Sequence, residues 1–152
     1  MGSSDHQPHE VSDTDDRSRF VRRRFTADAR NAARTRAEFG SWLDTHFTLG
    51  AQQFSDLLLA VNEAIANAAE FAYADASHRG TMDVTAAYDL DSDILAVTVN
   101  DRGRWRQNFS APATVQARGR GIQLMVALAD EVTIDRTPQG THVTLTWTDL
   151  TR

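Results

Sequence analysis

The sequence predicts an α+β domain, a two-layer α/β sandwich in which helices cover one face of a mixed, largely antiparallel sheet. Two observations support this fold class. Helical periodicity dominates residues 28–73, whereas alternating or continuous apolar runs, separated by turn signals, prevail after residue 82. The expected order is strand, two helices, two strands, a loop, a helix and a final hairpin, without any internal repeat.

The chain is expected to begin with a flexible acidic tail over residues 1–17, followed by one domain over residues 18–152. Residues 1–16 carry five acidic side chains, no arginine and a single branched aliphatic residue. Burial within such a segment cannot offset the entropy cost of ordering it.

Residues 20–25 have the composition of a short edge strand with arginines on one face. Asp28 is a suitable N-cap for a helix that extends to about residue 47, and a second helix is expected over residues 52–73. The apolar side chains expected to face the core are Ala32, Phe39, Trp42, Leu43 and Phe47 in the first helix, and Phe54, Leu57, Leu58, Val61, Ala64, Ile65, Ala68 and Ala72 in the second.

A hairpin follows the helices. Residues 82–89 and 94–99 have strand patterns, and Asp91 and Ser92 mark the turn between them. Residues 101–120 show little periodicity, and a loop of that length in a small domain is usually functional or mobile.

The final elements are a short helix and a second hairpin. The helix is expected over residues 122–129, and the strands over residues 132–136 and 142–147. A turn at residues 138–140 joins these two strands.

Composition excludes several kinds of function. The 152 residues include no cysteine and no lysine, and the 16 basic residues, all arginine, face 21 acidic residues for a net charge of −5. A disulfide framework, a thiolate metal site, a P-loop and Schiff-base chemistry are therefore excluded. The acidic balance argues against a nucleic-acid partner, and no apolar run approaches the roughly 20 residues of a membrane span. We expect a soluble, cytoplasmic protein.

The second helix carries the first candidate site. Asp56, Glu63, Asn67 and Glu70 lie within one narrow sector of it. Glu63 and Asn67 are four residues apart, so a carboxylate and an amide oxygen point to the same place among small residues. A carboxylate can act as a base, and an amide oxygen suits a hard ion such as Mg²⁺. A solvated helix face is the alternative explanation.

Three later segments are candidate parts of a binding pocket. Asp101 follows an apolar strand and precedes Gly103, a pattern suited to an exocyclic amine on a flat ring, although a simple turn also explains it. Residues 118–121 place two glycines just before a helix N-terminus, a pattern that favours phosphate binding. A flexible loop is the alternative explanation for this segment. Gly140 and Thr141 enter the last strand, where a hairpin turn is the alternative. As an ordered set, the segments are more specific than any one of them.

This ordered set resembles the sequence boxes of the Bergerat-type ATP-binding fold, the fold of gyrase and of histidine-kinase catalytic domains (the GHKL superfamily). Within it, the chain is most similar to the small single-domain anti-sigma factor serine/threonine kinases. Residues 60–67 resemble the N box, residues 101–103 and 118–125 the two glycine boxes, and residues 140–141 the last box. The resemblance covers roughly residues 20–148.

The resemblance implies a role for each matching residue. Glu63 would be the general base for the attacking serine hydroxyl, and Asn67 would bind the Mg²⁺ that bridges the ATP phosphates. Asp101 would bind the adenine amino group, with Thr141 supporting that contact through water. The remaining nucleotide-binding residues would be Gly103 below the adenine ring and Arg118, Gly119, Arg120, Gly121 and Ile122 around the phosphates. Solvation alone explains the two arginines equally well.

Two positions depart from the family pattern. Phe71 stands where the family often has histidine, and Trp105 replaces a glycine of the fuller first glycine box. The change at Phe71 affects a contact behind the presumed base and leaves Glu63 and Asn67 in place. It therefore bears on kinase activity more than on ATP binding.

The resemblance implies an ATP-dependent serine/threonine protein kinase that phosphorylates a STAS-type anti-anti-sigma factor, sequesters a sigma factor and forms a homodimer. Arginines of the first strand and helix are a candidate docking surface: Arg22, Arg23, Arg24, Arg30 and Arg34. An ordinary solvated face is the alternative explanation. Two other functions stay open. One is a non-catalytic switch that binds proteins in response to ATP or ADP. The other is a histidine-kinase catalytic domain, which the lack of a helical hairpin with a phosphoacceptor histidine disfavours.

Overall fold

The computed structural model describes residues 12–13, 16–72, 80–102, 121–138 and 140–151. Its strands are β1 (Ser12–Asp13), β2 (Arg19–Thr26), β3 (Thr81–Asp89), β4 (Ile94–Asp101), β5 (Glu131–Thr137) and β6 (Gly140–Trp147). Its long helices are α1 (Ala29–His46) and α2 (Ala51–Ala72), and residues 121–128 form a short helix.

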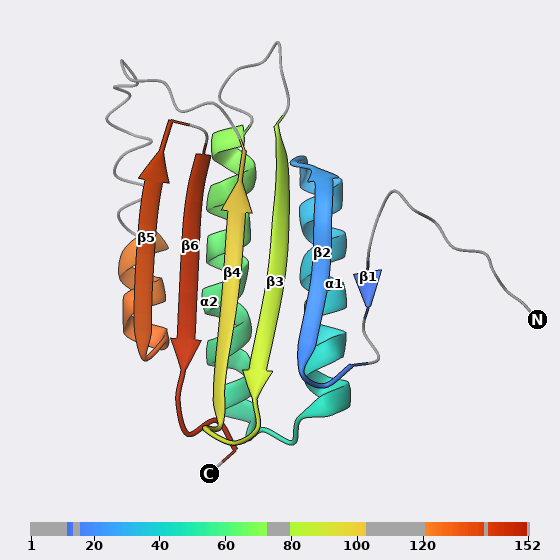
Figure 1. Ribbon diagram of the computed structural model, residues 1–152, viewed down its shortest axis with the longest axis vertical. Helices are drawn as coiled ribbons and strands as arrows, with labels where there is room; N and C mark the ends of the chain where they lie inside the picture. Colours follow the sequence, from blue (N-terminus) through green and yellow to red (C-terminus); the bar gives the residue numbers. More distant parts are fainter. Residues whose placement is uncertain (1–11, 14–15, 73–79, 103–120, 139, 152) are drawn as a thin grey trace, which may run out of the picture.

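The described strands form one sheet in the order β1-β2-β3-β4-β6-β5, and each of its pairings is antiparallel. The helices lie on one face of this sheet (Figure 1). This arrangement confirms the predicted two-layer α+β sandwich. No helix within the described ranges combines the length and the apolar composition that a membrane span requires.

Helix α1 begins and ends where local sequence predicts. The Asp28 side chain accepts a hydrogen bond of 2.8 Å from the backbone N–H of Asn31, and Phe47 is the C-cap. An N-cap carboxylate satisfies one of the N–H groups that have no partner within a helix. Apolar residues at helical spacing then face the sheet, as predicted: Ala32, Phe39, Trp42, Leu43 and Phe47 are all buried.

Helix α2 lies over the centre of the sheet and is lined by small side chains. Its buried residues are Leu57, Ala60, Val61, Ala64, Ile65, Ala68 and Ala69, which pack with Val84, Leu95, Val97 and Leu145 of the strands in one core cluster. The C-terminal part of α2, the end of β4 and the start of β6 meet at one end of the molecule (Figure 1).

The expectation for residues 20–25 is wrong in two respects. Strand β2 pairs with β1 as well as with β3, so it is not an edge strand among the described strands. A bulge between Arg22 and Phe25, with Arg24 at φ 56°, also separates the arginines. Arg22 is 2% exposed and turns toward α1, where its Nε lies 3.6 Å from Glu38 Oε1. Arg23 and Arg24 are exposed instead.

Part of the expected N-terminal tail belongs to the fold. Strand β1 pairs with β2, and the backbone carbonyl of Asp16 accepts a 2.8 Å hydrogen bond from Trp42 Nε1. An indole N–H needs a partner when its ring is buried, which explains this contact. Residues 1–11 and 14–15 lie outside the described residues, so the tail remains a prediction for them.

Candidate functional site

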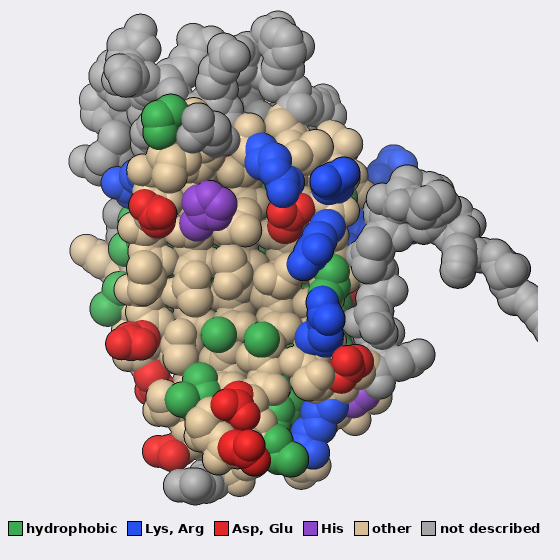
Figure 2. Space-filling model, viewed as in Figure 1, with side chains coloured by type: hydrophobic (Ala, Val, Ile, Leu, Met, Phe, Trp, Pro, Cys, Tyr) green, Lys and Arg blue, Asp and Glu red, His purple; other side chains and the backbone are tan. Residues whose placement is uncertain are grey.

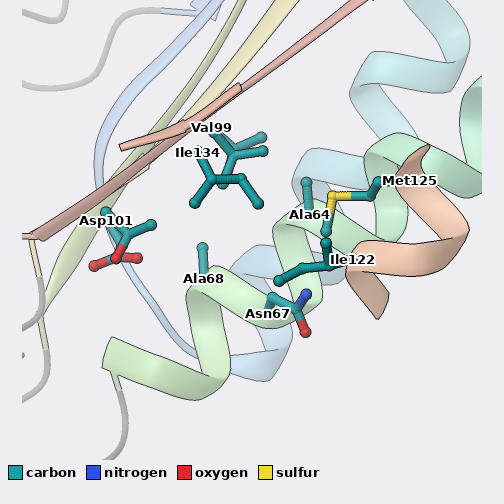
Figure 3. Close-up of a pocket in the computed structure, with 10 residues that line it drawn as sticks. Ala64, Asn67, Ala68, Val99, Asp101, Ile122, Met125 and Ile134 are labelled. Carbon is teal, nitrogen blue, oxygen red and sulfur yellow. The ribbon is translucent and has the colours of Figure 1, made fainter. Parts of the chain in front are cut away.

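A pocket opens between α2, the helix over residues 121–128 and the strands β4, β5 and β6 (Figure 3). The residues that line it are Ala64, Asn67, Ala68, Val99, Asp101, Ile122, Met125, Ile134, Thr141 and Val143. The pocket is therefore mostly apolar, with three polar side chains.

Two of these polar side chains are neighbours on adjacent strands. Asp101 is the last residue of β4, and the antiparallel register pairs it with Thr141 of β6. Asp101 is 4% exposed and Thr141 is 2% exposed. A carboxylate and a hydroxyl side by side at a pocket can form hydrogen bonds with the polar edge of a ligand.

Apolar side chains from both layers line the rest of the pocket. Val99 and Ile134 come from the sheet, and Ala64 and Ala68 come from α2 (Figure 3). Two alanines on adjacent turns leave room that larger side chains would fill. A flat apolar ring with one polar edge is the kind of ligand that such walls and such a carboxylate accommodate.

The third polar side chain, Asn67, is on α2 at the other end of the pocket. In Figure 3, Ala68 lies between Asn67 and Asp101. Asn67 and Glu63 both lie close to Gly121. A methyl group placed on Gly121 would be 2.8 Å from Asn67 Nδ2 and 3.3 Å from Glu63 Oε1. Glu63 and Asn67 therefore point to one place, as their spacing of four residues predicts, and that place is the start of the helix over residues 121–128.

This arrangement has the chemistry of an anion and metal site. The first turn of a helix has N–H groups with no partner inside the helix, and its dipole favours negative charge. The Glu63 carboxylate and the Asn67 amide oxygen are hard oxygen donors of the kind that Mg²⁺ takes when it also binds phosphate oxygens. The residues present therefore fit a magnesium ion.

The helix over residues 121–128 is held against the sheet at its other end. Trp147 Nε1 of β6 donates a 3.0 Å hydrogen bond to the carbonyl of Leu128. Met125, which is 1% exposed, packs in the core and also lines the pocket. These contacts connect the position of Gly121 to β6, the strand that carries Thr141.

The structure brings together most of the described residues that the sequence analysis proposed. Asn67, Asp101, Ile122 and Thr141 line the pocket, with Glu63 and Gly121 beside it. Four proposed residues lie outside the described residues and remain predictions: Gly103, Arg118, Gly119 and Arg120.

Asp56 does not take part in the site. It shares a helical sector with Glu63, but its Oδ1 accepts a 2.8 Å hydrogen bond from Gln52 Nε2 near the opposite end of α2. The side chain of Glu70 lies outside the described residues.

Sequence reasoning missed the apolar walls of the pocket. Val99, Ile134 and Val143 looked like ordinary core residues of strands, which their alternating pattern equally predicts. The sequence feature that could have indicated such a wall residue is its spacing from a polar residue at a strand end. Val99, for example, lies two residues before Asp101.

A family match and one similar crystal structure agree with this architecture. The family model described as the histidine kinase-like ATPase domain matches residues 25–147. The crystal structure of the RsbU and RsbW domains of Rv1364c from Mycobacterium tuberculosis is similar, with 28% identity and a TM-score of 0.61, over 81% of this chain and 30% of that chain. The histidine kinase domain of the blue-light activated histidine kinase from Erythrobacter litoralis EL346 has 23% identity and a TM-score of 0.46, over 63% of this chain and 44% of that chain. The chain thus spans less than half the length of either protein.

Proposed function

The chain belongs to the histidine kinase-like ATPase domain family, and from that premise we propose that it binds ATP and transfers the γ-phosphate to a serine or threonine of a partner protein. The observation that carries this proposal is the placement of Glu63, Asn67 and Gly121 together, beside a pocket that ends at Asp101 and Thr141. One end suits a purine and the other suits phosphates.

The adenine ring is proposed to lie between the alanines of α2 and the apolar strand residues. The Asp101 carboxylate would accept a hydrogen bond from the exocyclic amine, which adenine carries and guanine lacks at the same ring position. Thr141, directly opposite in the strand register, supports this contact through water in our proposal. Gly103 is proposed to lie below the ring.

The phosphates are proposed to lie over the start of the helix that begins at residue 121. Backbone N–H groups at Gly121 and Ile122 would bind them, joined by Arg118, Gly119 and Arg120. Asn67 would hold Mg²⁺ through its amide oxygen. When bound, Mg²⁺ supplies positive charge that offsets the charge on the phosphate oxygens.

Glu63 is proposed to be the general base. Its carboxylate, Oε1 of which is close to Gly121, would accept the proton of the attacking hydroxyl as that oxygen approaches the γ-phosphorus. Phosphoryl transfer depends mainly on positioning and charge neutralisation. A chain that has no lysine can therefore provide the site with a carboxylate, an amide oxygen, backbone N–H groups and arginines.

The proposed partners are a STAS-type anti-anti-sigma factor, as phosphate acceptor, and a sigma factor that a homodimer of this chain would sequester. The similarity to a structure containing RsbU and RsbW domains supports this choice. Exposed arginines on β2 (Arg23 and Arg24) and on α1 (Arg30 and Arg34) are proposed to contribute to docking.

The test is phosphate transfer from γ-labelled ATP, with Mg²⁺, to a panel of STAS domains. Glu63→Gln should retain ATP affinity within about twofold and lose transfer by a factor of about 10² to 10⁴, the usual contribution of a general base. Asp56→Asn is the matched control on the same helix, because Asp56 contacts Gln52 and not the pocket. Transfer by Glu63→Gln at the parental rate would refute the assigned base.

A second function has one observation in its favour. Phe71 occupies the N-box tail position where similar kinases often have histidine. A non-catalytic switch would bind ATP and ADP with the same residues, release its protein partner according to the nucleotide, and label no STAS domain in the same assay. Tight ATP binding without transfer to any partner would therefore favour the switch over the kinase.

A further inference from the structure

An ion pair lies immediately beyond the proposed adenine contact. Arg102 follows Asp101 in the chain, and its guanidinium donates to both oxygens of Asp83, at 3.1 Å to Oδ1 and 2.6 Å to Oδ2. This bidentate geometry fixes the direction of both side chains as well as their distance.

The pair lies on the sheet face opposite the pocket. Met82, which pairs with Asp101, is in the core that the helices cover, and Asp83 pairs with Asn100. Successive side chains of a strand point to opposite faces, so Asp83 points away from the helices. Figure 2 views this face and shows basic side chains gathered over β2 and the neighbouring end of the sheet.

Asp83 connects three segments of the chain. Besides Arg102, its Oδ1 accepts a 2.8 Å hydrogen bond from the backbone N–H of Arg24, at the left-handed position of the β2 bulge. The backbone N–H of Arg102 donates a 2.8 Å hydrogen bond to the carbonyl of Thr81, which extends the pairing of β3 with β4 by one residue. The end of β4 is thus held to β3, and through Asp83 to β2.

The other side of this strand end is equally constrained. A Cβ atom on Gly140 would lie 3.1 Å from Arg102 Cα and would collide with the carbonyl group of Asp101. The backbone of residues 101–102 therefore lies between β6 on one side and the Asp83 carboxylate on the other. A shift of Arg102 away from Asp83 would shift Asp101 with it.

We propose that Arg102 and Asp83 are positioning residues that set the base specificity of the nucleotide site by holding Asp101 at the pocket. This inference rests on the proposed function, in which Asp101 recognises the adenine amine. Guanine presents a carbonyl oxygen at the equivalent ring position, and a fixed carboxylate rejects it. A carboxylate free to shift would contact adenine less well and reject guanine less strongly.

A merely stabilising ion pair would behave differently. The Arg102 side chain is 48% exposed, and the Asp83 side chain is 9% exposed. Because the Asp83 carboxylate is nearly buried, removing the guanidinium leaves that charge less well compensated and should lower the melting temperature. A purely structural role would lower the affinities for ATP and GTP together, whereas the proposed role changes their ratio.

The experiment measures dissociation constants for Mg²⁺-ATP and Mg²⁺-GTP on the full chain and on Arg102→Gln, Asp83→Asn and the double variant. Each single variant should reduce the preference for ATP over GTP by about tenfold, the size of one lost charge-assisted hydrogen bond. The double variant should lose no more than one single variant, and Arg102→Lys should restore part of the preference. The matched controls are Arg19→Gln, exposed at the start of β2, and Asp135→Asn, exposed on β5.

Two results would overturn the inference. One is an unchanged preference for ATP in Arg102→Gln and Arg102→Lys. The other is an equal loss of affinity for both nucleotides, which would mean a structural role only. A parent protein that binds neither nucleotide, or binds both equally, would instead refute the proposed adenine site, so the two failures are distinguishable.

Discussion

The backbone of Gly121 lies against the side chain of Asn67, close enough that a methyl group on Gly121 would be 2.8 Å from Asn67 Nδ2. The same methyl group would be 3.3 Å from Glu63 Oε1. The β3–β4 hairpin separates these residues in the chain, yet α2 and the following helix meet at this point. The absence of a side chain at residue 121 is what permits the approach.

Gly121→Ala should therefore impair the site more than the fold. The added methyl group has to displace Asn67 and Glu63, which are partly exposed and able to move, so the loss of stability should be at the lower end of the 1–3 kcal/mol typical of overpacking. The affinity for Mg²⁺-ATP should fall at least tenfold. Titration calorimetry and chemical denaturation measure the two effects.

Gly50→Ala is the matched control for this change. A methyl group on Gly50 meets no atom within 4 Å, so both the affinity and the stability should stay close to those of the parent. An ATP affinity of Gly121→Ala equal to that of Gly50→Ala would mean that the contact with Asn67 has no role in binding.

Gly140→Ala should affect both folding and binding. A Cβ atom there collides with the backbone carbonyl of Asp101, and backbone cannot move aside as a flexible side chain can. We expect a loss of about 1–3 kcal/mol in the free energy of unfolding, together with weaker ATP binding because Asp101 is displaced. Urea denaturation and nucleotide titration test this, and unchanged values in both would show that the β4–β6 contact relaxes without cost.

Tyr88 should make stability depend on alkaline pH. Its hydroxyl donates a 2.7 Å hydrogen bond to Asp93 Oδ1, and this bond, followed by burial, raises the pKa of Tyr88 above the ordinary value of 10.0. Because the pKa is raised in the folded state, the contribution is fully present below pH 10. It is lost as the pH rises through the folded-state pKa.

Comparison with Tyr88→Phe isolates this contribution. The parent should be more stable than the variant by about 1 kcal/mol at pH 8, the net value of a typical hydrogen bond. The difference should shrink above pH 10, measured by urea denaturation from pH 8 to pH 11. A difference that grows with pH would contradict the assignment of the hydrogen bond.

The ends of α1 and the apolar faces of both long helices followed from local sequence. The Asp28 cap contacts an N–H three residues away, and the apolar stripe from Ala32 to Phe47 depends only on helical spacing. The pairing of Glu63 with Asn67 is local in the same sense, because residues four apart on a helix share a face. Such features need no knowledge of the rest of the chain.

The bulge in β2 could not be predicted in this way. The composition of residues 20–25 suggested a strand with its arginines on one face, but Arg22 shares the core face with Phe20 and contacts Glu38 of α1. The inserted residue leaves Arg23 and Arg24 exposed and returns Phe25 to the core face. The bulge is accompanied by the hydrogen bond from the N–H of Arg24 to Asp83, a residue of the next strand. The sequence of residues 20–25 alone does not indicate that Asp83 is the partner of Arg24.

The sequence by itself determined the elements from β2 onward and their order, the helix cap and the carboxylate–amide pair on α2, since each depends on residues within one or two helical turns or within one strand. Only the tertiary structure decided that Asp101 faces Thr141, that Gly121 meets Asn67, and that Arg102 holds Asp83. These relationships depend on strand register and on the packing of α2 against the sheet. Both arise from hydrogen bonds and contacts between distant residues, whose combined energy selects one arrangement among many with the same local pattern.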